Sequence, residues 1–376
     1  QLLNFNTEVN DEAFNYAKYK LTENIDMSVL APGVYNVPQK IFFGEFSGEN
    51  PLATDLDENF YIYGLTITNN FSLNNEHYSG LFSRLGAGSV VSDLNFTQSE
   101  LLFSDTDEIF SYSFYMGAIA GRMINATIEN VLVDVQYSLG NDAIGRTYLG
   151  GIVGEASGVL SKVASNGELN LENHSFVAGQ AIRPDYHIGG IVGAASDTSK
   201  LRVVEAINNS VITGFKTTSD IDLASGSTEI NVYIGGVIGY LKNSSSAIHE
   251  LVYVSNKGDI YVKDVLEREA VEAYQYVGGV FGYLEGLAPI LESEGEYKFA
   301  NLYNEGDLYS EYINSTAEIK SAGIGVSNTT ENTEFALMFN HGNFDYALVD
   351  SGELQTEYAS DLIISEYIEG SSNNKY

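Results

Sequence analysis

The sequence predicts an all-β fold, a β-solenoid of about eight coils in which each coil contributes three short strands. Two signatures recur along the chain: a glycine-rich hexapeptide, and a turn beginning with Asn that trails its later copies. A third observation is that the spacing between copies varies, with no obligatory helix between them. Together these features indicate a tandem array of short strands joined by loops that tolerate insertion.

The hexapeptide has an apolar residue, two glycines, two apolar residues and a third glycine. Complete copies occupy 149–154, 188–193, 234–239 and 277–282, and degenerate copies begin at Ser79, Met116 and Ala322. Consecutive copies are 33 to 46 residues apart, the extremes being Ala118 to Gly151 and Gly190 to Gly236. An α-helical solenoid has a nearly fixed period and is rich in helix formers. The β-branched, glycine-rich copies here favour buried strands instead.

The hexapeptide superficially matches a dinucleotide-binding fingerprint. That fingerprint needs a single copy that follows a strand, opens a helix and has an acidic residue about twenty positions on. Seven tandem copies without following helices argue against it. We therefore interpret the glycines as structural, since they let the backbone turn tightly or approach a neighbour where a side chain would clash.

The turn signature begins at five asparagines, each with an apolar residue one or two positions earlier: Asn166, Asn208, Asn256, Asn304 and Asn340. A new alternating strand follows the clearest copies, at 259–262 and 307–309. Stacked strands place equivalent residues about 4.8 Å apart, so the amides of equivalent asparagines can bond to one another. We therefore expect a ladder of asparagine side chains that includes Asn256 and Asn304.

These segments resemble a known repeat, and the resemblance extends upstream to 19–28, 42–48 and 61–67. Over roughly residues 12 to 345 the chain is similar to the GLUG-type repeat regions of bacterial surface proteins. The resemblance implies a right-handed parallel β-helix in an exported bacterial protein. Such regions occur in adhesins and beside the protease domain of some immunoglobulin A peptidases. The sequence contains no His-Glu-x-x-His motif, so the peptidase activity is not carried over.

Along the chain we expect three regions. Residues 1–60 form an N-terminal cap and entry strands, with a short capping helix over 10–18 that has Asn10 as its N-cap. Residues 61–346 form the repeat β-helix, with one helical loop insertion at 263–274, which contains no glycine. Residues 347–376 form a C-terminal strand or cap, placed at 361–368, and a flexible tail.

Composition limits the function classes. The chain carries 51 acidic and 18 basic residues, a net charge of −33, so nucleic acid and anionic membrane are disfavoured partners. Cysteine is absent, and no apolar stretch is long enough to span a membrane. The chain starts at Gln1, which we interpret as a mature or excised fragment. We expect an extracellular or cell-surface location and a larger parent polypeptide.

Residues with catalytic potential are sparse. The acidic clusters lie in expected loops, where solvated acids are favoured over Ca²⁺ ligands: Asp55, Asp57 and Glu58; Asp105, Asp107 and Glu108; Asp220 and Asp222. The group Arg183, Pro184, Asp185 and His187 is best explained as a turn entering a strand. Eight Asn-x-Ser/Thr sequons are about as many as chance gives in such a chain.

Tyrosine occurs 26 times and tryptophan not at all. Six tyrosines recur at related repeat positions, namely Tyr233, Tyr240, Tyr276, Tyr283, Tyr303 and Tyr309. We favour stacked ladders of these rings over a carbohydrate- or protein-binding face. We therefore expect a non-enzymatic surface module, an adhesin or stalk, with no catalytic or cofactor-binding residues. The alternatives are a polysaccharide-active or carbohydrate-binding β-helix, and a calcium-dependent surface assembly subunit. A host or neighbouring-cell protein or glycan is the expected partner.

Overall fold

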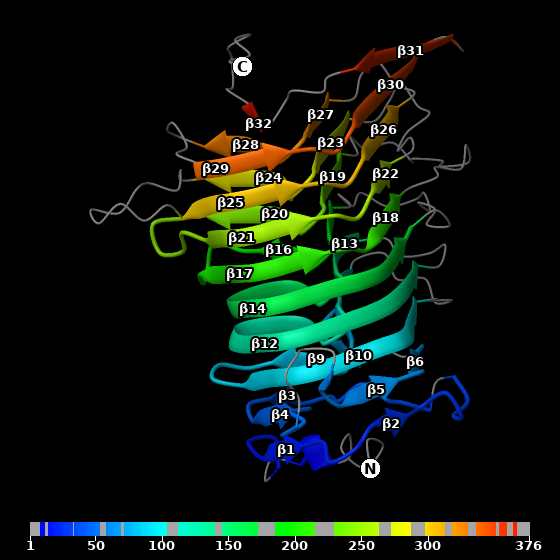
Figure 1. Ribbon diagram of the computed structural model, residues 1–376, viewed down its shortest axis with the longest axis vertical. Coiled ribbons are helices and arrows are strands. Elements are labelled where there is room, and N and C mark those ends of the chain that lie inside the picture. Colours follow the sequence, from blue (N-terminus) through cyan, green and yellow to red (C-terminus); the bar gives the residue numbers. More distant parts are fainter. Residues whose placement is uncertain are drawn as a thin grey trace.

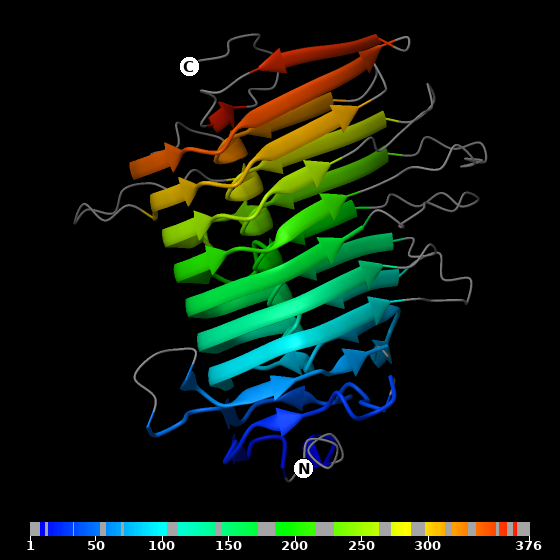
Figure 2. The same cartoon turned by 45° about the vertical axis from the view of Figure 1, so that its right-hand side comes forward.

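The protein is all-β, with parallel strands in a long sheet (Figure 1). The structure, a computed structural model, describes residues 8–11, 14–32, 34–52, 58–68, 71–103, 112–139, 145–171, 185–214, 229–262, 272–286, 298–312, 318–329, 336–350, 353–358 and 364–366. Two sheets contain the described strands, one of 24 strands and one of eight. Strands of successive repeats lie above one another along the long axis (Figure 2).

Apart from β7 (Phe71–Leu73), the strands of the smaller sheet each end at or next to a hexapeptide copy. These strands are β8 (Glu76–Ser79), β11 (Tyr112–Met116), β13 (Gly145–Gly150), β15 (Asp185–Gly189), β19 (Glu229–Gly235), β23 (Glu272–Gly278) and β27 (Glu318–Ala322). All pair in parallel except β7, which forms an antiparallel hairpin with β8. Asn74 and Asn75 both have positive φ in its two-residue turn, as a type I′ turn requires.

The larger sheet contains three rows of strands. The row that follows the glycine turn holds β3 (Ile41–Phe42), β9 (Phe82–Leu85), the first parts of β12 (Ala120–Leu139) and β14 (Val153–Asn170), β16 (Val192–Ala195), β20 (Ile238–Asn243), β24 (Phe281–Gly286), β28 (Gly325–Thr329) and β32 (Ile364–Glu366). The middle row holds β1 (Lys18–Lys20), β2 (Ile25–Asp26), β4 (Glu45–Ser47), β5 (Tyr61–Tyr63), the first part of β10 (Val90–Phe103), the middle parts of β12 and β14, β17 (Leu201–Asn208), β21 (Glu250–Asn256), β25 (Phe299–Asn304) and β29 (Ala336–Asn340). The last row holds β6 (Thr66–Ile67), the final parts of β10, β12 and β14, β18 (Val211–Gly214), β22 (Ile260–Val262), β26 (Leu308–Tyr312), β30 (Phe344–Asp350) and the antiparallel β31 (Glu353–Tyr358).

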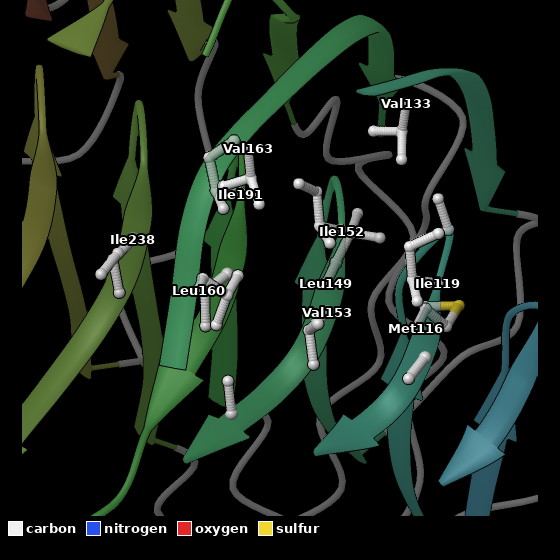
Figure 3. Close-up of a cluster of buried hydrophobic side chains, with 14 of the residues drawn as sticks. Met116, Ile119, Val133, Leu149, Ile152, Val153, Leu160, Val163, Ile191 and Ile238 are labelled. Carbon is white, nitrogen blue, oxygen red and sulfur yellow. The ribbon is translucent and has the colours of Figure 1, made fainter. Parts of the chain in front are cut away.

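One hydrophobic cluster runs through the stack from Val9 to Ile324. The apolar residues of the hexapeptide supply much of it, because Leu149, Ile152 and Val153 and their counterparts in later copies are fully buried. Figure 3 shows such side chains gathered between the strands. The repeat is therefore recognisable in the sequence because the same core positions recur in each set of strands.

The predicted asparagine ladder is confirmed. Asn208 Nδ2 donates to Asn256 Oδ1, Asn256 to Asn304 and Asn304 to Asn340, each at 2.8 Å. The same amide groups also donate to the carbonyl two residues on, as Asn256 does to Gly258 at 2.8 Å. The first three asparagines have no exposed surface. Each rung thus satisfies its buried polar atoms by bonding to the next repeat.

The two sequence signatures are in contact. A Cβ placed on Gly190, Gly236, Gly279 or Gly323 would overlap the side chain of the ladder asparagine of the same repeat. For Gly279 it would also overlap the carbonyl oxygen of Gly323. The second glycine of the hexapeptide is therefore required by the asparagine, which explains why the two signatures recur together.

Asn166 is an exception to the predicted ladder. Strand register places Ser165, not Asn166, opposite Asn208. Asn166 accepts a hydrogen bond from Asn209 instead, among exposed side chains. The ladder therefore begins one repeat later than the sequence pattern suggested.

A second column was not visible in the sequence. Seven non-glycine residues with φ between 52° and 58° occupy the same place in seven successive strands of the middle row: Asp93, Asn130, Lys162, Glu205, Tyr253, Asn301 and Leu337. This left-handed conformation bends each strand at the same point. Asp and Asn adopt it readily, whereas Tyr253 and Leu337 do so at a cost.

The predicted helix over 10–18 is wrong for the part that the structure describes. Glu8 and Val9 lie in a helical turn, and Val9 packs into the core. Asn10 is not an N-cap, since its Oδ1 accepts the backbone N–H groups of Gln39 and Lys40. Lys18 already belongs to β1, which pairs with β4. Pairing with residues 43–47 thus overrides the local helical pattern.

Two further sequence predictions meet the structure only in part. The end of the predicted helical insertion is wrong, because Glu272, Ala273 and Tyr274 lie in β23 and pair with β19. The rest of that insertion, 263–271, lies outside the described residues. The predicted final strand or cap at 361–368 is a strand at β32, which pairs with β28, and the rest of that range lies outside the described residues.

Candidate functional site

The richest cluster of chemical groups lies on the side of the smaller sheet that faces away from the main core. Along β15, Tyr186 points into the core cluster, and the next residue, His187, points to the opposite side. The residues in register with His187 form a column of six rings: Tyr78, Tyr115, Tyr148, His187, Tyr233 and Tyr276. Successive ring centroids are 4.7 to 5.5 Å apart. The expected stacking of Tyr233 and Tyr276 is confirmed.

A second column runs beside the first, on the strands that follow the glycine turn. Its members are in register and follow the last position of each hexapeptide copy: Arg84, Arg122, Glu155, Ala194, Tyr240 and Tyr283. Tyr240 and Tyr283 pack against the first column, with Tyr276 and Tyr283 centroids 4.4 Å apart. The second column is therefore charged toward the N-terminal repeats and aromatic toward the C-terminal ones, whereas the first consists of rings throughout.

Arg122 organises the charged half. Its Nε lies 2.6 Å from Glu155 Oε2, and its Nη1 lies 3.8 Å from Glu76 Oε1. The guanidinium also sits over the ring of Tyr115, at 5.3 Å from the centroid. Tyr78 donates a hydrogen bond to Glu76. The Arg122 guanidinium thus interacts with the carboxylates of Glu155 and Glu76 beside the rings of Tyr78 and Tyr115.

Burial controls the proton affinities in this cluster. Desolvation raises the pKa of Glu155 above its ordinary value, and Arg122 opposes that rise. Desolvation and the neighbouring Glu76 raise the pKa of Tyr78 to about 12. Burial, reinforced by Glu155, raises the pKa of Tyr148 to about 12. A carboxyl group of raised pKa beside hydroxyl donors and an arginine can hold or transfer a proton, and it can bind a hydroxyl-rich ligand.

Sequence reasoning missed Glu76, Arg122 and Glu155. A usable signal was present for two of them, because Arg122 and Glu155 each directly follow the last glycine of a hexapeptide copy. Equivalent positions hold residues of different chemistry, so the repeat pattern did not single them out.

Asp185 and His187, from the mixed-charge group, have structural roles. Asp185 opens β15, binds Arg146 Nε at 3.0 Å and accepts a hydrogen bond from Asn231 at 2.8 Å. His187 lies within the ring column, where desolvation, with Arg146 nearby, lowers its pKa to about 3. It is therefore neutral at physiological pH. Arg183 and Pro184 lie outside the described residues.

The predicted acidic loops remain untested as cation sites. Glu58 is exposed, whereas the other members of the three clusters, including Asp105, Asp107 and Glu108, lie outside the described residues. Within the described ranges no group of three or more His, Cys, Asp or Glu is placed to hold a metal ion. Calcium binding stays a prediction, and a melting temperature that calcium leaves unchanged would remove it.

Two more surface observations bear on recognition. Three sequon asparagines, Asn95, Asn208 and Asn243, are buried and so are closed to glycosylation in the folded chain. On the middle row, Tyr253 is 61% exposed and Phe339 is 45% exposed. Tyr303 stacks with His341 there at 5.2 Å between ring centroids, and its ring is tilted by 45° against that of Phe339 at 5.7 Å.

Comparison with known proteins yields no relative: no family model, curated protein or solved structure matches this chain. In the part of the chain that the structure describes, no helix is long and apolar enough to cross a membrane.

Proposed function

We propose that the chain is a right-handed parallel β-helix of about eight coils. Support comes from the parallel pairing of equivalent strands in successive repeats and from the asparagine ladder, which needs equivalent residues to stack. The resemblance to GLUG-type repeat regions points to the same architecture. In this proposal the two sheets are the faces of a single coil.

We propose further that this β-helix is a non-enzymatic extracellular module of a larger bacterial surface protein, acting as an adhesin or a structural stalk. The observation that carries the proposal is the stacking of the repeats around one elongated core, stabilised by buried asparagine side chains that bond from each repeat to the next. Such an array is rigid along its axis and presents long, regular outer faces. Its charge of −33 favours solubility and disfavours edge-to-edge aggregation.

An adhesive role predicts binding without turnover. We would screen the chain on arrays of glycans and on immobilised host surface proteins, and assay every glycan that binds for released reducing sugar. Saturable binding without product supports the proposal. Turnover of any glycan would refute the non-enzymatic role. If no ligand binds, the adhesive role is refuted and the structural-stalk role stands.

A second function, polysaccharide cleavage, is favoured by one observation. Glu155, whose pKa is raised, and Glu76 both approach Arg122 beside tyrosine hydroxyls, which is a plausible acid–base arrangement for a sugar substrate. If this site is active, Glu155→Gln abolishes reducing-sugar release, whereas Glu129→Gln, at an exposed position on another row, leaves it unchanged. No release by the unmodified chain removes this candidate.

A further inference from the structure

Strand β29 lies at the C-terminal end of the stack with one edge paired. It bonds to β25 on one side, and no described strand pairs with its other side. Its neighbours differ, because β28 is followed by β32 and β30 by β31 (Figure 1). An edge strand of this kind exposes a row of backbone donors and acceptors to another chain.

The asparagine ladder also stops at β29. Asn256 and Asn304 each use Nδ2 twice, once for the carbonyl two residues on and once for the asparagine of the next repeat. Asn340 Nδ2 makes the first of these bonds, to Gly342 at 3.2 Å. Across the described residues, no further asparagine accepts its second N–H. The backbone repeats the pattern, since His341 N–H donates to Asn304 O and Glu305 N–H to Asn256 O.

The turn after the ladder asparagine sets a second requirement. A Cβ on Gly258, Gly306 or Gly342 would overlap a backbone carbonyl oxygen of the preceding repeat, for example that of Gly306 in the case of Gly342. A strand stacked on β29 therefore needs glycine two residues after its own asparagine. An apolar residue two positions before the asparagine completes the pattern, because Val254 and Leu302 fill the core there and Met338 packs against it.

The exposed side of β29 is apolar as well. Leu337 is 61% exposed and Phe339 is 45% exposed, and the strand contains neither a charged residue nor proline. Natural edge strands usually carry such features to prevent association. Among the described residues, strand β29 therefore combines an edge without a paired strand, a ladder donor without a second acceptor and an exposed apolar surface.

We propose that the edge of β29 with which no described strand pairs binds a parallel strand of sequence apolar–x–Asn–x–Gly, a further repeat of this chain's own type, by β-augmentation. The side-chain oxygen of the incoming asparagine accepts a hydrogen bond from Asn340 Nδ2. The glycine two residues later lies against the carbonyl oxygen of Gly342, where a Cβ atom would overlap it. The partner is thus defined by the same two residues that join every preceding pair of repeats.

The test uses the full chain and labelled synthetic peptides. One peptide has the sequence of residues 299–308, and two matched peptides carry Asn304→Ala or Gly306→Val. Fluorescence anisotropy should show saturable binding of the first peptide and at least about tenfold weaker binding of each matched peptide. On the protein side, Asn340→Ala should weaken binding by a similar factor, and Asn209→Ala should leave it unchanged.

Several outcomes would overturn the proposal. The proposal is wrong if the first peptide shows no saturable binding. It is also wrong if all three peptides bind equally, because equal binding would indicate non-specific apolar contact. A concentration-dependent dimer that Leu337→Lys abolishes, without peptide binding, would assign the edge to self-association instead. Because the peptide variants leave the protein unaltered, the test does not depend on whether Asn340→Ala folds.

Discussion

Replacing Asn256 by alanine removes a central rung of the ladder. The change deletes three hydrogen bonds, each 2.8 Å long: from Asn208 Nδ2, to Asn304 Oδ1 and to the carbonyl of Gly258. A hydrogen bond contributes about 0.5–1.5 kcal/mol net, and buried partners left unpaired add to the loss. We therefore expect Asn256→Ala to lower the free energy of unfolding by about 3 kcal/mol.

Asn209→Ala is the matched control, because Asn209 is exposed and makes one side-chain bond, to Asn166. It should change stability by less than about 0.5 kcal/mol. Urea unfolding followed by circular dichroism and by tyrosine fluorescence measures both, since the chain has 26 tyrosines and no tryptophan. Coincidence of the two signals justifies a two-state free energy. Equal stabilities of the two variants would refute the ladder as a source of stability.

Three further changes test other parts of the fold. Gly279→Val should destabilise by more than about 4 kcal/mol, because its Cβ overlaps backbone and ladder atoms, and an unchanged melting temperature would contradict this. His187 has its pKa lowered from 6.5 to about 3, so the folded state binds fewer protons and the stability present above pH 6.5 is lost as the pH falls toward 3. Between pH 7 and 5 the free energy of unfolding of the unmodified chain should therefore fall by about 2 kcal/mol more than that of His187→Tyr. If the free energies of unfolding of the two proteins change in parallel with pH, the lowered pKa of His187 is refuted. Tyr253 and Asn301 both have a left-handed backbone conformation, so Tyr253→Asn should stabilise the fold by about 1 kcal/mol and Asn301→Tyr should destabilise it by as much. If both changes shift the free energy of unfolding in the same direction, backbone strain is excluded as the cause.

The sequence identified the scaffold wherever equivalent residues recur for the same physical reason. The second glycine of the hexapeptide and the ladder asparagine recur because each occupies space that a side chain on the other would need. The pattern misplaced the first rung. Asn166 is directly followed by Gly167, whereas the glycine lies two residues after Asn256, Asn304 and Asn340, and Ser165, which has that spacing, holds the ladder position. The distance from an asparagine to the following glycine therefore separates a turn asparagine from a ladder asparagine in these copies, and strand register confirms the difference.

The charged cluster could not be predicted in the same way. Arg122 and Glu155 occupy equivalent positions, but one copy is basic and the next acidic, so periodicity hides the ion pair between them. Glu76 reaches the cluster from a different sheet. At the N-terminus, Asn10 carries a helix-capping signal that its bonds to Gln39 and Lys40 override. The charged cluster and the bonds of Asn10 were not predicted because both depend on contacts between segments that are distant in the sequence.

The most direct test of the stacked-repeat architecture is a disulfide between successive repeats, which the absence of cysteine makes unambiguous. Arg202 and Glu250 are register partners on β17 and β21, and adjacent strands place such Cα atoms about 5 Å apart, within disulfide range. The double variant Arg202→Cys/Glu250→Cys should oxidise fully to an intramolecular disulfide. Arg202→Cys/Val252→Cys, offset by two residues and about 8 Å, should stay reduced. Equal oxidation of the two pairs, or cross-linking of the offset pair alone, would contradict the register on which the whole account depends.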